Sequence, residues 1–348
     1  MILTTYENRP ACLVGVKILV KSLARHLPDA RIRIWCPGGP PFAEFFNWLE
    51  TQPNVLPSPV RPLTGSGWNV KPSVLLYELD QGAEEAIWID ADIILGGDPQ
   101  FLLTADRRTL IATAGMRWDE TEHGTAKRTA ALGLAVGRDI PGIVSSSIVR
   151  VTTEHRALLE AWDRVLQSED YLRWQQQPFW DRPAHAAGDQ DVLMGLLGAT
   201  EFSWIPIKYI ASGRGIAHCF FSVGYTTMER LQNSFRGPPP FVHAPSPAKP
   251  WNNAPPLSVE ISPYPWVAAG YRDEISDSMD WTRPRSTAGR LLNRLFVGEP
   301  NLRGLPLSIV REAKLYFDRG MVALRSVRRP SRGSNQGSSR RRLGGKTT

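Results

Sequence analysis

The sequence contains few cysteines and no long apolar run. Its three cysteines, Cys12, Cys36 and Cys219, are widely spaced, which excludes a disulfide framework and the close spacing of a zinc site. We expect all three to pack as small apolar residues. No segment reaches the roughly 18 uncharged apolar residues that a spanning helix needs, and the first residues lack the pattern of a secretory signal. These absences predict a cytoplasmic protein.

Acidic residues are scarce at one end of the chain. From Trp281 to Thr348 there are 16 Lys and Arg against 3 Asp and Glu, whereas residues 1–280 carry 25 against 31. The net charge of +7 therefore conceals an acidic body and a basic tail. Because basic segments attract anionic partners, we expect the tail to meet something anionic while the body carries the chemistry.

Apolar patterns near the start of the chain alternate between strand and helix. Ile2–Tyr6 is a short apolar run, helical spacing extends from Leu13 to His26, and Arg31–Trp35 alternates as a strand does. This alternation predicts an α/β fold with a mainly parallel sheet flanked by helices. Ligands bind beyond the carboxyl ends of strands in such sheets, so polar residues that follow strands are the candidates for a site.

The remaining segments are interpreted in the same way. Strands are predicted at Val55–Leu63, Ala86–Ile94, Leu110–Ala114 and Ser147–Thr152. Helices are predicted at Ser73–Leu79, Glu154–Gln167, Val192–Leu197, Leu291–Phe296 and Leu307–Leu324. The Gly- and Pro-rich residues 236–256 are predicted to form a loop. We expect a body of residues 1–280, an amphipathic helical extension of residues 281–329 and a disordered basic tail of residues 330–348.

Two carboxylates follow the apolar segment that begins at Ala86. Asp90 and Asp92 are separated by one residue, and in an extended segment such positions face the same side. Burying an uncompensated carboxylate costs several kcal/mol, so a cation is expected to meet the pair. A hard divalent cation such as Mg²⁺ or Mn²⁺ prefers oxygen ligands of this kind. The alternative is a strand end that carries two solvated acids.

Four further segments carry polar residues of types that bind cations, phosphates or sugars. His243 and Lys249 lie six residues apart in the Pro-rich loop; imidazole suits Mn²⁺, and an ammonium neutralises a diphosphate. Gly188-Asp189-Gln190-Asp191 opens a helical segment, where one acid serves as a cap but two exceed that need. Lys71 precedes a helix, and Ser145 to Ser147 enter a strand.

Taken in this order, Lys71-Pro72, Asp90-x-Asp92, Ser145 to Ser147, Asp189-Gln-Asp191 and His243-x5-Lys249-Pro-Trp251 resemble the family 8 retaining glycosyltransferases over about residues 1–255. The resemblance implies a GT-A fold with a mixed, Rossmann-like sheet, and a nucleotide-diphosphate-sugar donor, usually a UDP-sugar. It implies Mn²⁺, or Mg²⁺, held by Asp90, Asp92 and His243.

The same resemblance implies roles for individual residues. Lys249 would meet the diphosphate, Lys71 and Asp189 would contact the donor sugar, and Gln190 would lie near the anomeric carbon. The donor-binding set also takes in Thr4, Tyr6, Asn8, Ala91 and Ser145. The chain departs from the family at Ser145 to Ser147, where Asn and a Ser/Ala-Gly pair are usual, and at Ser246, where Gly is usual.

Other interpretations stay open at this point. A nucleotidyltransferase also uses carboxylates and Mg²⁺, but its usual Gly-rich phosphate loop is missing from Leu3–Arg9. A non-catalytic protein of the same fold could bind nucleic acid or membrane through the basic tail. The Leu307–Leu324 segment could pack on the body or lie on an anionic membrane beside a glycan or lipid-linked acceptor. We expect a metal-dependent hexosyltransferase, cytoplasmic and peripheral on the inner face of the membrane.

Overall fold

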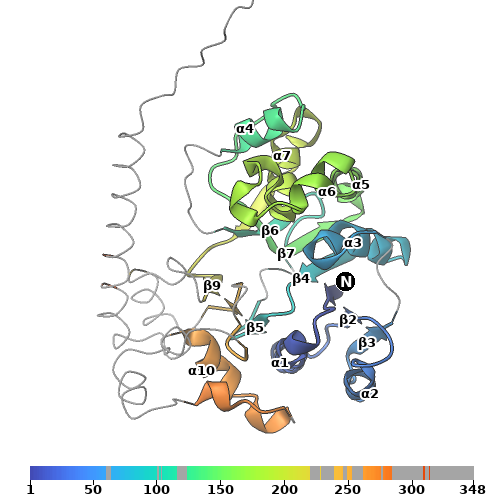
Figure 1. The fold of residues 1–348 in the computed structure, drawn as a ribbon, viewed down its shortest axis with the longest axis vertical. Coiled ribbons are helices and arrows are strands. Elements are labelled where there is room, and N and C mark those ends of the chain that lie inside the picture. The colour runs from blue at the N-terminus through green and yellow to red at the C-terminus, as the bar shows by residue number, and fades with distance from the viewer. Residues whose placement is uncertain are drawn as a thin grey trace, which may run out of the picture.

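A seven-stranded mixed sheet forms the centre of the molecule (Figure 1). The computed structural model describes residues 1–59, 64–99, 102, 104–115, 124–219, 228, 239–245, 249–252, 262–275, 277–283, 309 and 313. The sheet has the order β3-β2-β1-β4-β7-β6-β8. Its strands are β1 (Ile2–Tyr6), β2 (Ile32–Trp35), β3 (Val55–Ser58), β4 (Glu85–Ile89), β6 (Leu110–Ala114), β7 (Val144–Thr152) and β8 (Ile207–Ile210).

Only one strand of this sheet runs against the others. β7 is antiparallel to both β4 and β6, while the remaining neighbours pair in parallel. The mixed, mainly parallel sheet flanked by helices that the sequence predicts is therefore confirmed. Because β7 is reversed, its first residues lie beside the carboxyl end of β4, where ligands are expected.

Helices cover both faces of the sheet (Figure 1). Along β4, Ala86 and Trp88 face one hydrophobic cluster and Ile87 and Ile89 face the other, as the two-residue period of a strand requires. The first cluster takes in residues of α3 (Lys71–Asp80), α5 (Arg156–Leu166) and α7 (Asp189–Gly198). The second takes in residues of α1 (Leu13–His26) and α2 (Ala43–Glu50).

A second, three-stranded sheet lies beside the first. It consists of β5 (Ile93–Leu95), β10 (Phe241–His243) and β9 (Ile216–His218), with β10 in the middle. β10 is antiparallel to β5 and parallel to β9. Two predictions are therefore wrong: Ala86–Ile94 is not one strand, and residues 236–256 are not all loop. Both short strands gain their hydrogen bonds from partners far away in the sequence, which local patterns do not reveal.

The remaining helices complete the described part of the body. α4 (Thr125–Ala131) and α6 (Glu169–Gln175) lie on the same side as α7, and α10 (Pro263–Ala269) packs against the small sheet. α4 approaches α7 closely because Gly198 has no side chain; a Cβ there would lie 2.4 Å from both Thr125 Cγ2 and Thr129 Oγ1. This close packing holds the helix that begins with Asp189.

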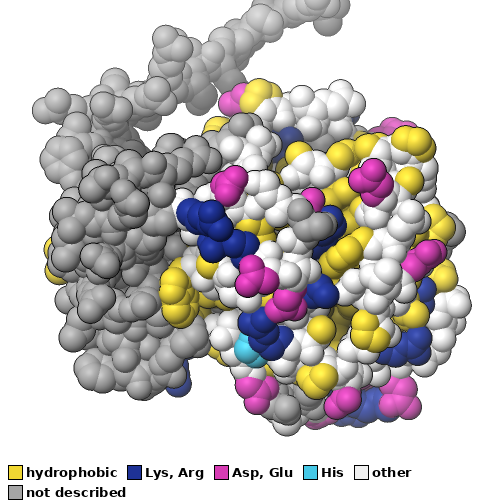
Figure 2. Space-filling model, turned by 90° about the horizontal axis from the view of Figure 1, so that it is seen from below, with side chains coloured by type: hydrophobic (Ala, Val, Ile, Leu, Met, Phe, Trp, Pro, Cys, Tyr) yellow, Lys and Arg dark blue, Asp and Glu magenta, His cyan; other side chains and the backbone are white. Residues whose placement is uncertain are grey.

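Several predictions concern surface and membrane properties. All three cysteines are buried and unbridged, as predicted. Within the described ranges, no helix is long and apolar enough to cross a membrane. Figure 2 shows basic and acidic side chains interspersed on the described part of one face of the molecule. The predicted helices at Leu291–Phe296 and Leu307–Leu324 and the tail of residues 330–348 lie outside the described residues, apart from residues 309 and 313.

Candidate functional site

The chain turns sharply between the two sheets, and this turn carries two carboxylates. β4 ends at Ile89, the Asp90 N–H donates to the Ser147 carbonyl oxygen (2.8 Å), and the Ile93 N–H donates back to the Asp90 carbonyl oxygen (3.1 Å). Asp90 and Asp92 therefore lie in a turn and not in an extended strand, which corrects the geometry expected from the sequence. The turn, held to β7 through Ser147, brings the carboxylates of Asp90 and Asp92 close together.

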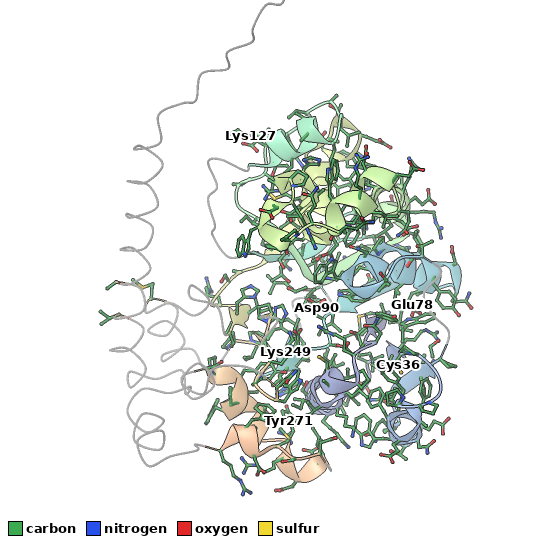
Figure 3. The ribbon with its side chains drawn as sticks, viewed as in Figure 1. Cys36, Glu78, Asp90, Lys127, Lys249 and Tyr271 are labelled. Carbon is green, nitrogen blue, oxygen red and sulfur yellow. The ribbon has the colours of Figure 1, made fainter. Side chains whose placement is uncertain are left out.

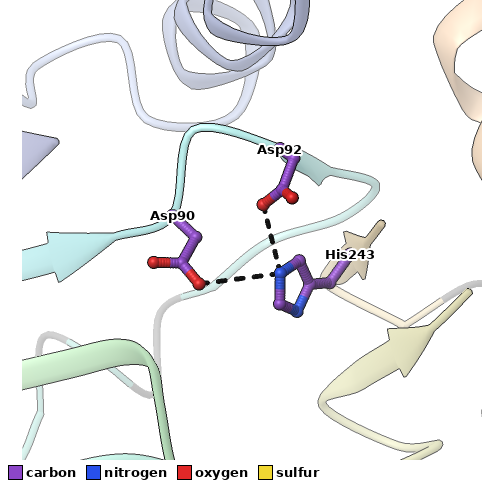
Figure 4. A group of neighbouring side chains, drawn as sticks. All are labelled: Asp90, Asp92 and His243. Carbon is purple, nitrogen blue, oxygen red and sulfur yellow. Dashed lines mark ion pairs between the residues drawn. The ribbon is translucent and has the colours of Figure 1, made fainter. Parts of the chain in front are cut away.

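His243, which lies about 150 residues further along the chain, meets the two carboxylates (Figure 4). It ends β10, where it pairs with Ile93 immediately after the turn. Its Nε2 lies 3.1 Å from Asp92 Oδ1 and 3.7 Å from Asp90 Oδ2. One ligand atom from each of the three residues lies within 4.8 Å of the others. The convergence that the sequence predicts for these three side chains is found.

The chemistry of this group fits a divalent cation. Burial alone would raise the pKa of Asp92, but the charges of Lys249 and His243 outweigh it and hold that pKa well below its usual range. The carboxylate is therefore ionised. His243 is buried, its Nε2 faces the two acids, and its Nδ1 has no hydrogen-bond partner among the described residues. Two carboxylates and one imidazole nitrogen form a ligand set that could hold a divalent cation.

Lys249 lies at the edge of this group, as Figure 3 shows relative to Asp90. Its ammonium donates to Asp92 Oδ2 and to the Ala244 carbonyl oxygen, the latter at 2.7 Å. The side chain is buried, so its charge is screened very little by solvent. The sequence predicts contact between Lys249 and a diphosphate. In the structure the Lys249 ammonium lies against the Asp92 carboxylate, beside the group that could hold a cation.

Lys71 forms the centre of a second polar group next to Asp90. Its ammonium lies 3.2 Å from Asp90 Oδ1 and 3.2 Å from Asp189 Oδ2, and it donates to the Ser146 hydroxyl at 2.9 Å. Burial lowers the pKa of Lys71, but the two carboxylates, Asp189 first, more than offset this and raise it. The lysine is therefore charged, and it joins the turn after β4 to the first residue of α7.

The first turn of α7 carries two acids with different partners. Asp189 accepts from the Ser146 hydroxyl and faces Lys71. Asp191 instead accepts from the Arg128 guanidinium (3.0 and 3.1 Å) and from the Gly188 N–H (3.1 Å). Burial raises the pKa of Asp191 to about 6, although Arg128 opposes the rise. Asp189 thus belongs to the site, while Asp191 anchors the start of the helix to α4.

The raised pKa of Asp191 predicts how stability depends on pH. Its folded-state pKa of about 6 lies above the ordinary 3.8, so the folded protein binds this proton more tightly and loses stability as pH rises between these values. About two pKa units correspond to about 3 kcal/mol. The free energy of unfolding of Asp191→Asn, measured in urea from pH 4 to 7, should not show this decrease. The exposed Asp170→Asn is the control, and equal pH profiles for wild type and Asp191→Asn would contradict the assignment.

The residues predicted from the sequence to flank the donor are spread over different environments. Thr4 is fully buried and its hydroxyl accepts from the Trp35 indole N–H (3.0 Å), so its side chain lies in the core. Tyr6 is half-buried, Asn8 is exposed, and Ala91 is buried inside the turn. Tyr6 ends β1, Asn8 lies just beyond it and Ala91 follows β4, but their role toward a nucleotide stays a prediction.

Ser145 and Gln190 lie on either side of the Lys71 group. Both are half-buried. The Ser145 hydroxyl donates to the Ser147 hydroxyl at 3.3 Å and has no contact with Lys71, whose hydroxyl partner is Ser146. Gln190 follows Asp189 in the first turn of α7 and makes no hydrogen bond through its side chain among the described residues. Its role toward a donor sugar stays a prediction.

Sequence reasoning missed several residues that shape the site. The Trp88 indole N–H donates to Asp90 Oδ1 (2.7 Å), and its ring lies 5.5 Å from the Lys71 ammonium. The Trp162 indole N–H donates to the Asp189 carbonyl oxygen (2.9 Å). His218 packs beside His243, with ring centroids 5.5 Å apart, and burial lowers the pKa of His218 to about 3, so it is neutral. Of these residues, only Trp88 could have been found from the sequence, because it lies two residues before Asp90 and positions at that spacing in a strand face the same side.

No family model and no curated protein sequence matches the chain. Solved structures that are similar to it include the bifunctional glycosyltransferase WbbM (11% identity, TM-score 0.46, covering 79% of this chain) and the galactosyltransferase LgtC in complex with donor and acceptor sugar analogues (15% identity, TM-score 0.46, 79% of this chain). The glycosyltransferase GlyE of Streptococcus pneumoniae is similar at 13% identity and a TM-score of 0.41, over 78% of this chain.

These similar proteins differ from the chain in length. The chain spans half of the WbbM structure, all of the LgtC structure and 63% of the GlyE structure. Each of the three is described as a glycosyltransferase.

Proposed function

We propose that the chain is a metal-dependent glycosyltransferase of the GT-A type that moves a sugar from a nucleotide-diphosphate donor, a UDP-sugar in the first instance. The observation that carries the proposal is the meeting of Asp90, Asp92 and His243 within 4.8 Å, with Lys249 on one side and Lys71 and Asp189 on the other. Such a site offers ligands for a cation, positive charge for a diphosphate and polar groups for a sugar.

Each group has a role that follows from its charge. Asp90, Asp92 and His243 would hold the cation, which supplies positive charge against the charge that develops on the departing diphosphate. Lys249 adds a buried ammonium beside that position, where low solvent screening strengthens its effect. Asp189, which pairs with Lys71, would offer its carboxylate oxygens to sugar hydroxyls.

We further propose that the transfer retains the anomeric configuration. A covalent intermediate would need a carboxylate nucleophile at the anomeric carbon. Gln190, the half-buried residue that follows Asp189, is an amide and a poor nucleophile. Because an amide does not form such an intermediate readily, we favour attack from the same face as the leaving group, with the departing phosphate oxygen accepting the proton of the acceptor hydroxyl.

The proposed function is tested by screening nucleotide-sugars for Mn²⁺-dependent hydrolysis and for thermal stabilisation of the protein. A donor that binds the folded state raises stability by mass action, by about 2.7 kcal/mol at 100 times its Kd. We expect one UDP-sugar to stabilise the protein only when Mn²⁺ or Mg²⁺ is present. Stabilisation by free nucleoside triphosphates with release of pyrophosphate would indicate a nucleotidyltransferase instead.

Gln190→Ala should lower kcat far more than it weakens donor binding. A side chain beside the anomeric carbon acts mainly where charge develops, so its removal affects the transition state more than the ground state. We expect kcat to fall by about 100-fold, with less than about a threefold change in donor Kd measured by calorimetry. Glu201→Gln, at an exposed acid just after the C-terminal end of α7, is the control. A large change in Kd with an unchanged kcat would contradict this role.

The acceptor and the cellular place form the last part of the proposal. We propose a glycan or lipid-linked acceptor, and a protein whose basic segment after residue 281 attracts it to an anionic membrane surface on the cytoplasmic side. The segregation of 16 basic against 3 acidic residues in that segment supports this part. The body of residues 1–280 would then carry the transfer reaction by itself.

A further inference from the structure

The turn that leads into α3 places a tryptophan at the surface beside the site. The short 3-10 helix η2 (Gly67–Val70) runs directly into α3, so Trp68 and Lys71 lie three residues apart in one continuous turn. Side chains at this spacing in a 3-10 turn point the same way. Lys71 is buried against Asp189, whereas 51% of Trp68 is exposed. Trp68 therefore lies toward the solvent side of the Lys71 group.

Contacts within the fold hold the tryptophan in this position. The Tyr171 hydroxyl, from α6, donates to Asn69 Oδ1 at 2.8 Å and so ties η2 to α6. Burial raises the pKa of Tyr171, Asp189 adds to the rise, and the Trp68 side chain, as a hydrogen-bond donor, opposes it. The Tyr171 hydroxyl thus holds the residue that follows Trp68 and lies close enough to Asp189 to respond to its charge.

The residues just before Trp68 are small, and about half of Trp68 (51%) is exposed. Gly65 and Gly67 precede it with φ values of +80° and +56°, conformations that favour glycine. Both glycines and Ser66 are exposed and small, so no large side chain from this turn covers the indole. A membrane-inserting surface would need several apolar neighbours. A single flat, fixed aromatic ring among small polar residues instead matches a ring-shaped ligand with apolar C–H bonds on its face and hydroxyls at its edge.

We propose that Trp68 is a stacking platform for a pyranose ring of the acceptor, and that the acceptor is therefore a carbohydrate at the position that receives the new sugar. This inference rests on the proposed function, because it assigns the acceptor side of the same site. The donor side holds the buried charges of Lys71, Asp189 and Lys249. The uncharged Trp68 indole would stack on the apolar face of the acceptor pyranose. The acceptor hydroxyl that attacks the donor sugar would thereby be held near Gln190.

The test compares Trp68→Ala and Trp68→Phe with Trp204→Ala. Trp204 is also half-exposed, at 53%. It precedes β8, whose first residue Ile207 pairs with Leu110 at the opposite end of β6 from the site, so it is a matched control. Binding of a panel of methyl pyranosides to the full chain is measured by saturation-transfer NMR. In parallel, hydrolysis of the nucleotide-sugar donor without acceptor is measured for each variant.

We expect Trp68→Ala to weaken binding of the methyl pyranosides about tenfold and Trp68→Phe about threefold, because stacking area is lost in that order. Trp204→Ala should bind as the wild type does, and donor hydrolysis should persist in every variant. Undiminished pyranoside binding by Trp68→Ala would overturn the inference. Failure of every pyranoside to bind the wild type would overturn it too. The same holds if Trp68→Ala loses binding to phosphatidylcholine vesicles, measured by sedimentation, while its sugar binding does not change. Absence of donor hydrolysis in the wild type would instead count against the proposed function.

Discussion

Asp92→Asn is expected to weaken Mn²⁺ binding and to lower Mn²⁺-dependent donor hydrolysis by at least about 100-fold. The substitution keeps the shape of the side chain but replaces an ionised carboxylate with a neutral amide. His243 Nε2, now 3.1 Å from Asp92 Oδ1, and the Lys249 ammonium both lose their anionic partner. Mn²⁺ affinity is measured by electron paramagnetic resonance of the free ion, and hydrolysis by release of the nucleoside diphosphate.

Two further variants make this experiment decisive. Asp90→Asn alters the more exposed acid of the pair and should also weaken Mn²⁺ binding. Glu84 lies before β4, at the opposite end of the strand; it is exposed and pairs with Arg107 at 3.7 Å, so Glu84→Gln should behave as the wild type. If both aspartate variants are folded by circular dichroism and bind Mn²⁺ with unchanged affinity, the cation does not lie at this turn.

Lys71→Met should lower the free energy of unfolding by about 3–5 kcal/mol, the usual effect of removing one partner from a buried ion pair. Lys71 compensates both Asp90 and Asp189, each at 3.2 Å, and the three side chains share little solvent. Without it, Asp90 and the buried Asp189 both lose a cationic partner. Urea unfolding measures the change, and donor hydrolysis should fall as well because Asp189 loses its fixed position.

A surface pair provides the comparison. Arg173 pairs with Asp170 on α6, and both side chains are mostly exposed, so Arg173→Met should change the unfolding free energy by less than about 1 kcal/mol. A loss below about 1 kcal/mol in Lys71→Met as well would mean that the two acids do not depend on the lysine. Such a result would contradict the role of Lys71 as the residue that compensates the charges of Asp90 and Asp189.

The helices and strands that the sequence predicts well have their own periodic pattern. Leu13–His26 is predicted and observed with the same bounds, because its apolar spacing matches the buried face that packs on the sheet. Ile2–Tyr6 likewise carries the signature of a buried strand. In both cases the information lies within the segment itself.

Other parts of the site depend on partners that local patterns do not contain. The chain leaves β4 at Asp90 because β5 pairs with β10, a three-residue strand inside a Pro-rich segment. The choice between Ser145 and Ser146 as partner of Lys71 depends on the register of β7, which shifts opposite Ala112 and Thr113. The identities of Asp90, Asp92 and His243 could be predicted from residue type and spacing. Their geometry could not.

The turn after β4 has a consequence for the order in which the site is built during synthesis. Asp92 and Lys249, which touch in the folded protein, are 157 residues apart in the chain. A nascent polypeptide that ends before His243 carries both aspartates but neither the imidazole nor the second ammonium. Closing so long a loop costs entropy that only the folded sheets repay. A growing chain on the ribosome therefore brings Asp90, Asp92 and His243 together only after most of the body has been translated.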